Sequence, residues 1–264
     1  MESFEYHRPA SLSEAVSILQ QGKGARFLAG GQSLLPAMKH DLATPKRLVS
    51  LRDVADLKGI RVEDGRVRIG AMTTHAEMAG SLDVRGALPA LAAMAGQIGD
   101  PQVRNRGTLG GSVAHADPAA DYPAALVALD ATVETDRREI AADDFFQGMF
   151  TTALGRDELV TAVRFPIPEC AGYAKFASPA SRFAIVGVMV ARGGGRVRVA
   201  VTGAGRSVFR QRDMERALAA DFSPGALDGV SQSAEGLTSD LEASAEYRAH
   251  LVGVMARRAV AACR

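Results

Sequence analysis

The chain has 264 residues, 47% of them hydrophobic, which is enough for one large domain or two ordinary ones with buried cores. Its 31 lysines and arginines nearly balance its 30 acidic residues, which argues against a nucleic-acid partner. No stretch is apolar for the length of a membrane span, and the first residues lack the basic and apolar regions of a signal peptide, so we expect a cytoplasmic protein without a membrane span.

The N-terminal segment predicts a β-α-β-like unit. The stretch SLSEAVSILQQG indicates a helix, because Ser11 and Glu14 form a capping box and apolar residues recur at helical spacing. The stretch RFLAGG, residues 26–31, is typical of a short buried strand that runs into a glycine turn. RLVSL, residues 47–51, predicts a second strand.

A second layer begins with a hairpin at GIRVEDGRVRIGAMTT, where Asp64 and Gly65 supply the positive φ angles of a tight turn. Thr74 and Glu77 then form another capping box, and ALPALAAMAGQIG predicts a helix of small residues. Further along, DYPAALVALD predicts a helix with Pro123 in its first turn, and ATVET and ELVTAVRFP predict strands.

The stretch FPIPECAG combines two prolines with a glycine and is the best candidate for a domain boundary. After it, two strand patterns surround Gly193, Gly194 and Gly195, which predicts a hairpin. RDMERALAAD and SAEYRAHLVGVMARRAVAAC predict helices. We therefore expect a sheet with helices packed on it in the last third of the chain.

Two separated glycine pairs are the strongest sign of a ligand. Consecutive glycines let main-chain N–H groups converge on an anion, and AGGQS follows a predicted strand while TLGGS precedes turns and a helix N-terminus. Together the two loops could hold the two phosphates of a dinucleotide, although each pair alone could equally make a simple turn. Neither loop fits a Walker loop or the Gly-x-Gly-x-x-Gly pattern, and GAGRSV, residues 203–208, lacks the third glycine of that pattern.

The stretches LAGGQSLLPAMK, GDPQVRNRGTLGGSVAHADPAAD and ASAEYRAHLV together resemble the medium, FAD-binding subunit of the molybdenum hydroxylases, the group of xanthine dehydrogenase and aerobic carbon monoxide dehydrogenase. The resemblance runs from FEYHRP near the start to the final predicted helix. It implies an α+β fold with a vanillyl-alcohol-oxidase-type (PCMH-type) FAD-binding domain over 1–168, in subdomains of about 1–55 and 56–168. A smaller C-terminal α+β domain over 169–264, a sheet with packed helices, resembles that of the carbon monoxide dehydrogenase flavoprotein.

The resemblance also implies a function. In this family the medium subunit binds FAD and takes electrons from the 2Fe-2S clusters of a small partner subunit, after a large molybdopterin subunit has oxidised the substrate. It passes these electrons to an external acceptor and performs no hydroxylation itself. We therefore expect an oxidoreductase subunit with FAD as cofactor, in a heterotrimer with these two partners that itself dimerises.

The resemblance places the site residues in two loops and at a few single positions. The two loops that match the pyrophosphate-binding segments consist of Ala29, Gly30, Gly31, Gln32 and Ser33, and of Thr108, Leu109, Gly110, Gly111 and Ser112. Asp121 matches an acidic residue that contacts the cofactor. Val160 and Lys175 match flavin-contacting positions at the domain junction, and Phe183 lies where some relatives place an aromatic ring beside the isoalloxazine.

Two positions depart from the family pattern. Gln32 stands where several relatives have histidine, and Ser112 where several have asparagine or aspartate. Both side chains keep their ability to form hydrogen bonds, so we still expect FAD to bind. No metal site is expected, because His115 and Asp117 lack a third ligand and fit a capped turn better.

Other polar residues have ordinary interpretations. Arg104 and Arg106 could clamp a phosphate, or could pair with Asp100 and a neighbouring subunit, and the solvated ion pair is the default interpretation of exposed arginines. Cys170 and Cys263 lie far apart in the sequence without metal-ligand spacing, so neither a disulfide framework nor a thiolate cluster is expected.

Two alternatives stay open from the sequence alone. The first is a flavin-free scaffold or interaction protein with the same fold, motivated by the departures at Gln32 and Ser112. The second is a stand-alone flavin oxidase, although no catalytic acid or base is legible. The substrate of the expected complex (carbon monoxide, an aldehyde or an aromatic N-heterocycle) and the electron acceptor also stay open.

Overall fold

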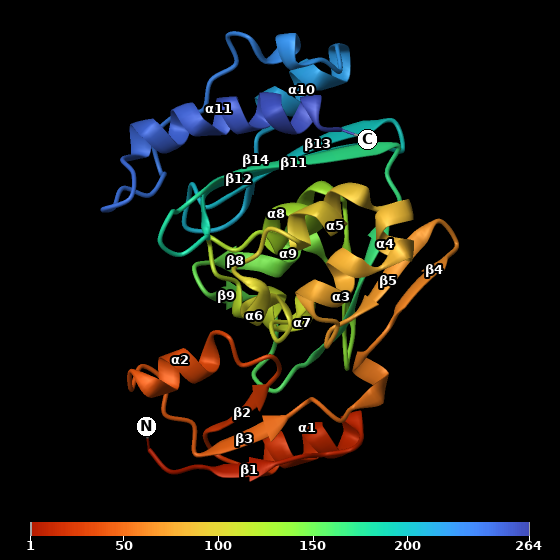
Figure 1. The fold of residues 1–264 in the computed structure, drawn as a ribbon, viewed down its shortest axis with the longest axis vertical. Helices are drawn as coiled ribbons and strands as arrows, with labels where there is room; N and C mark the ends of the chain where they lie inside the picture. The colour runs from red at the N-terminus through yellow and green to blue at the C-terminus, as the bar shows by residue number, and fades with distance from the viewer. Residues whose placement is uncertain (1, 264) are drawn as a thin grey trace.

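Residues 2–263, which the computed structural model describes, form three larger sheets and a two-stranded ribbon. The three larger sheets follow one another along the long axis of the molecule, from the N-terminal sheet at one end to the C-terminal sheet at the other (Figure 1). The architecture is therefore α+β, as the family resemblance implies. Among the described residues, no helix is both long and apolar enough to cross a bilayer.

The N-terminal sheet is parallel, with strand order β1-β3-β2. Its strands are β1 (Glu5–His7), β2 (Ala25–Leu28) and β3 (Arg47–Ser50), and its helices are α1 (Leu12–Gln21) and α2 (Leu34–Lys39). The predicted cap of α1 is confirmed, because the Ser11 hydroxyl accepts the N–H of Glu14 at 3.2 Å. The Glu14 carboxylate accepts the N–H of Ala10 at 2.9 Å, one residue before the capping position. Sequence reasoning missed β1, which is a short edge strand without a buried face.

The central sheet is antiparallel, with strand order β4-β5-β10-β6-β7. Its strands are β4 (Ile60–Glu63), β5 (Arg66–Gly70), β6 (Thr132–Thr135), β7 (Glu139–Ala141) and β10 (Val160–Pro166). The predicted hairpin is β4–β5, and its turn residues Asp64 and Gly65 have φ angles of 49° and 69°. Positive φ at both turn positions matches the right-handed twist of the strands that the turn joins.

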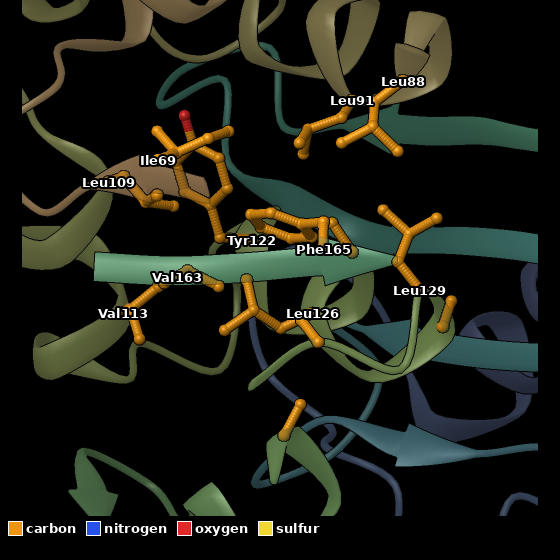
Figure 2. Close-up of a cluster of buried hydrophobic side chains, with 14 of the residues drawn as sticks. Ile69, Leu88, Leu91, Leu109, Val113, Tyr122, Leu126, Leu129, Val163 and Phe165 are labelled. Carbon is orange, nitrogen blue, oxygen red and sulfur yellow. The ribbon is translucent and has the colours of Figure 1, made fainter. Parts of the chain in front are cut away.

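Helices cover one face of the central sheet and form the main core with it. The short helix η1 (Ala55–Leu57) leads into β4. The segments between the strands are α3 (His75–Gly80), α4 (Leu82–Ala87), α5 (Pro89–Ala95), α6 (Pro101–Arg104), α7 (Leu109–His115), α8 (Tyr122–Ala128), α9 (Ala142–Phe145) and the ribbon β8 (Phe146–Gly148)–β9 (Thr151–Thr152). Figure 2 shows Val163 and Phe165 of β10 among the side chains of Tyr122 and Leu126 from α8, all fully buried. The predicted helix in ALPALAAMAGQIG is shorter than expected, because α5 begins at Pro89 and ends before Gly96.

The C-terminal sheet has strand order β11-β12-β13-β14 and antiparallel pairing throughout. Its elements are β11 (Cys170–Ala177), β12 (Ala184–Gly193), β13 (Arg196–Thr202), β14 (Phe209–Arg210), α10 (Arg212–Ala220), η2 (Pro224–Leu227) and α11 (Ala245–Ala261). The predicted hairpin is β12–β13, with Gly194 and Gly195 at positive φ in its turn. Helices α10 and α11 lie on the outer face of this sheet, and α5 and α8 lie on the face toward the central sheet (Figure 1).

The chain changes sheets within the stretch FPIPECAG. Strand β10 ends at Pro166 in the central sheet, and β11 begins at Cys170 in the C-terminal sheet. This change supports the division into 1–168 and 169–264, which remains a proposal.

The two cysteines meet in space although they are far apart in the sequence. Both are free thiols, and Cys263 lies beside Cys170 where the chain leaves α11. Burial, and then the neighbouring Cys170, raise the pKa of the Cys263 thiol to about 12. Cys263 is therefore a protonated and weakly nucleophilic thiol at neutral pH.

Replacing Gly172 with alanine tests how α11 is packed on β11. A Cβ at Gly172 would lie 2.0 Å from the carbonyl oxygen of Ala259, so α11 has to move away from the strand. We expect Gly172→Ala to lower the free energy of unfolding by about 1–3 kcal/mol, measured by urea denaturation. Gly86→Ala in α4 is the matched control, because nothing lies within 4 Å of the added Cβ. It should be neutral or stabilising, and equal destabilisation by the two variants would contradict this packing.

Candidate cofactor-binding site

The first glycine loop lies between β2 and α2, and its main chain contacts the segment that leads into α7. A Cβ at Gly30 would lie 2.0 Å from the carbonyl oxygen of Arg106 and 2.8 Å from the Cα of Gly107. Only a residue without a side chain allows this approach. Gly31 has a φ of 76°, a left-handed conformation that also favours glycine. The structure therefore brings the first predicted loop into direct contact with the two residues that precede the second loop.

The first loop has main-chain donors to offer. Within residues 2–263, no protein group accepts a hydrogen bond from the N–H groups of residues 29–33. Gly30 and Gly31 are half-buried, while Gln32 and Ser33 are exposed. A run of N–H groups around a left-handed glycine suits an anion such as a diphosphate. This loop therefore has the chemistry that the sequence predicts for it.

The second glycine pair lies inside a helix instead of ahead of one, which differs from the prediction. Thr108 is the N-cap of α7, and its hydroxyl accepts the N–H of Gly111 at 3.2 Å. The N–H groups of Leu109 and Gly110 donate to the carbonyl oxygens of Thr73 at 3.0 Å and Ala71 at 2.8 Å. Each of these donors already has a protein acceptor.

Close packing explains why Gly110 is a glycine. A Cβ there would lie 2.5 Å from the Cβ of Ala71, which directly follows β5. Within the described chain, the N–H of Thr108 and the hydroxyl of Ser112 have no protein acceptor. A Cβ at Gly111 would lie 3.4 Å from the Cβ of Ala29 in the first loop. In the second loop, the N–H of Thr108 and the hydroxyl of Ser112 are thus the donors that a ligand could use.

His75 packs against Gly107 and so supports the contact between Gly30 and Gly107. This residue was not identified from the sequence. Its N–H donates to the carbonyl oxygen of Gly107 at 3.0 Å, and its Nδ1 lies 3.0 Å from the Tyr122 hydroxyl. A Cβ at Gly107 would lie 2.6 Å from Nε2 of the ring. Burial, and then the charge of Arg104, lower the pKa of His75 to about 4, so the ring is neutral at pH 7. The only sequence signal was its position directly after the Thr74 cap.

Asp121 and Lys175 come together at the junction of the central and C-terminal sheets. Lys175 Nζ donates to the Asp121 carboxylate at 3.0 Å, and both side chains are at most 5% exposed. The Tyr173 hydroxyl donates to the other carboxylate oxygen of Asp121. Lys175 Nζ also donates to the carbonyl oxygens of Gln97 at 3.3 Å and Arg182 at 3.2 Å. Burial raises the pKa of Asp121, while Lys175 and Tyr173 oppose that shift.

Val160 and Phe183 have different surroundings from this pair. The Val160 side chain is 2% exposed and packs in the central core, so only its main chain is available to a ligand. Phe183 follows Arg182, which has a φ of 65°, and its side chain is 44% exposed in the turn between β11 and β12. Contacts of either residue with the cofactor remain a prediction.

The expected ion pair of Arg104 with Asp100 is not formed in the structure. Its guanidinium donates to the carbonyl oxygens of Ile98 at 3.0 Å and Gly99 at 3.2 Å, not to Asp100. The Asp100 carboxylate is used as a cap, accepting the N–H of Val103 at 2.8 Å. Arg104 therefore holds the backbone of the turn ahead of α6 by hydrogen bonds. Residue spacing alone does not reveal this role.

Comparison with known protein families matches residues 2–168 to the family described as the FAD binding domain in molybdopterin dehydrogenase. The chain belongs to this family. It is also 40% identical to the carbon monoxide dehydrogenase medium chain of Afipia carboxidovorans, over 98% of this chain and 96% of the relative. The nicotine 6-hydroxylase medium subunit of Paenarthrobacter nicotinovorans is 38% identical, over 98% of this chain and 97% of the relative.

Chains of solved enzyme structures have the same fold as this protein. A structure of reconstituted carbon monoxide dehydrogenase from Oligotropha carboxidovorans matches with a TM-score of 0.89 and 37% identity, covering 99% of this chain and 97% of that chain. Quinoline 2-oxidoreductase from Pseudomonas putida 86 matches with a TM-score of 0.89 and 31% identity, covering 98% and 96%. The predicted family, the α+β fold with a PCMH-type FAD-binding domain, and FAD as cofactor are confirmed.

Replacing Gly30 with alanine tests the loop contact. The added Cβ would overlap the carbonyl oxygen of Arg106, so the two loops have to separate. We expect Gly30→Ala to weaken FAD binding at least about tenfold, equal to about 1.4 kcal/mol, in a fluorescence titration. Gly80→Ala, whose added Cβ meets nothing within 4 Å, should bind FAD like the wild type. Wild-type affinity in Gly30→Ala would show that the loop contact is not needed.

The pH dependence of stability tests the environment of His75. Its pKa in the folded state is about 4 against 6.5 in its ordinary state, so the unfolded chain binds the proton first as pH falls. We expect the free energy of unfolding to decrease by roughly 3 kcal/mol between pH 6.5 and pH 4 because of this group. His75→Gln should remove that part of the slope in urea titrations, while His40→Gln, at an exposed position, should keep it. Equal slopes for wild type and His75→Gln would contradict a buried neutral ring.

Proposed function

We propose that this protein is the FAD-carrying electron-transfer subunit of a molybdopterin-dependent hydroxylase or dehydrogenase complex. The observation that carries the proposal is the contact of Gly30 with Arg106 and Gly107, beside which the first loop keeps its N–H groups without a protein acceptor within residues 2–263. Family membership and the named functions of the relatives support it.

In this proposal, residues from both loops bind the diphosphate of FAD. The N–H groups of residues 29–33 are the donors for one side of the diphosphate, and Thr108 and Ser112 are those for the other. The departures at Gln32 and Ser112 leave an amide and a hydroxyl at the loop contact, and both groups can donate hydrogen bonds. Bound FAD would supply the redox chemistry, accepting electrons from a partner subunit and releasing them to an external acceptor.

The partners in this proposal are a small 2Fe-2S subunit and a large molybdopterin subunit, in a heterotrimer that dimerises. The chain covers 96% and 97% of two relatives that are named a medium chain and a medium subunit, which supports a role as one part of a larger assembly. Its two cysteines are too few to hold a 2Fe-2S cluster with four thiolates. We therefore place the clusters and the molybdenum centre in the partners.

The substrate of the complex stays open in this proposal. Relatives named for carbon monoxide, nicotine and xanthine are all similar to this chain, so similarity to the family does not identify the substrate. We assign substrate selection to the large subunit and keep the electron acceptor open. A cytoplasmic location remains part of the proposal and agrees with the free thiols of Cys170 and Cys263.

Reconstitution with FAD tests the proposal. The purified chain mixed with FAD should show flavin absorbance that stays with the protein through gel filtration, and its thermal unfolding temperature should rise. The chain alone should not reduce its flavin with any of these substrates, whereas the complex from the native host should. Loss of flavin on gel filtration would favour the flavin-free scaffold, and reduction of the flavin by the chain alone would favour a stand-alone oxidase.

A further inference from the structure

The turn between α7 and α8 is held by the C-terminal sheet. The N–H of Gly203 donates to the carbonyl oxygen of Pro118 at 2.8 Å, and the N–H of Ala184 donates to that of Ala119 at 3.2 Å. The Thr202 hydroxyl also lies 2.9 Å from the carbonyl oxygen of Pro118. Because α7 carries the second glycine pair, the C-terminal sheet controls the segment directly after the candidate cofactor site.

Asp121 ends this turn and is held by two side chains from one strand. Tyr173 and Lys175 are two residues apart on β11, so they project from the same face of the sheet. Each donates to a different oxygen of the Asp121 carboxylate. The carboxylate is 5% exposed and therefore depends on these two donors for its charge to be tolerated.

Lys175 has no donor in reserve. An ammonium has three N–H groups, and its nitrogen is within 3.3 Å of three acceptors: Asp121, the carbonyl oxygen of Gln97 and that of Arg182. If the Tyr173 hydroxyl were absent, Lys175 could not replace it without giving up one of these bonds. Tyr173 is thus the donor that fixes the second carboxylate oxygen.

Gly187 makes room for the Tyr173 hydroxyl. This glycine lies in β12 and pairs with Lys175 of β11. A Cβ at Gly187 would lie 2.4 Å from the Tyr173 Oη and 3.1 Å from its Cζ. The backbone at Gly187 is extended strand, so space and not a left-handed conformation requires the glycine.

We propose that Tyr173 and Gly187 are positioning residues of the FAD site, in which the Tyr173 hydroxyl passes over Gly187 to hold Asp121 and with it the turn that follows the second glycine loop. This inference rests on the proposed function, because its readout is FAD binding. Tyr173 acts through Asp121. A role in the hydrophobic core alone would depend on the ring of Tyr173 but not on its hydroxyl.

A double-mutant cycle in the full chain tests the inference. We expect Tyr173→Phe and Gly187→Ala each to raise the dissociation constant for FAD about tenfold, because a hydrogen bond to a buried charge is lost or displaced. The double variant should bind within about twofold of Tyr173→Phe, because without the hydroxyl the nearest atoms to the added Cβ are Thr202 Cγ2 at 3.0 Å and the ring Cζ at 3.1 Å. Side-chain shifts of a few tenths of an ångström relieve both contacts without moving Asp121. Tyr247→Phe, with a side chain 44% exposed, is the matched control and should bind like the wild type.

The pH profile separates positioning from simple packing. Removing the Tyr173 hydroxyl takes away a hydrogen bond to the charged form of Asp121, so the pKa of this carboxyl should rise further. FAD affinity of Tyr173→Phe should therefore start to fall at a higher pH than that of the wild type, in titrations between pH 8 and pH 5. Because Tyr173→Phe preserves the ring, it keeps the test valid even if Gly187→Ala fails to fold.

The outcomes distinguish this inference from the proposed function. If the wild type does not bind FAD, the proposed function fails and the inference fails with it. If the wild type binds FAD but Tyr173→Phe has the same affinity and pH profile, only the inference is overturned. Independent, multiplicative effects of the two substitutions would also overturn it, because they would show that Gly187 does not act through the Tyr173 hydroxyl.

Discussion

The rest of the site depends on one close approach of two main chains. At Gly30, the loop after β2 lies so near the carbonyl oxygen of Arg106 that no side chain fits between them. This contact joins the N-terminal sheet to the segment that enters α7, although 76 residues separate Gly30 from Arg106 along the chain. It leaves the N–H groups of the first loop beside the second loop, where we propose that the diphosphate binds.

The two glycine pairs are needed for different structural reasons. The first combines a close approach at Gly30 with a left-handed turn at Gly31, and its N–H groups have no protein acceptor within the described chain. The second lies in the first turn of α7, where the N–H of Gly110 donates to Ala71 and the missing side chain lets the helix pack directly behind β5. Similar sequence patterns thus give one loop whose N–H groups are left without a protein acceptor and one helix turn that packs.

The C-terminal sheet contributes to the site through a buried polar junction. Asp121, Lys175 and Tyr173 are nearly inaccessible to solvent, and an ion pair in such a place contributes little net stability unless its remaining donors and acceptors are used. Here Lys175 also binds two main-chain carbonyl oxygens, one from the segment after α5 and one from the turn before β12. The junction therefore meets this condition, and it fixes how the C-terminal sheet sits against the central helices.

The sequence alone determined the local elements and the family. Hairpins at Asp64–Gly65 and Gly194–Gly195, the caps of α1 and α3, and the glycine-loop motifs depend on contacts within a few residues, so they are legible in the order of the amino acids. Only the tertiary structure decided that Gly30 meets Arg106, that Gly110 is used for packing, and that His75 and Tyr173 support the site. These features depend on which segments become neighbours, and the same residue types, a buried histidine or a strand tyrosine, occur in many cores without such a role. Long-range placement assigns their function because it decides which donors are already used and which remain free.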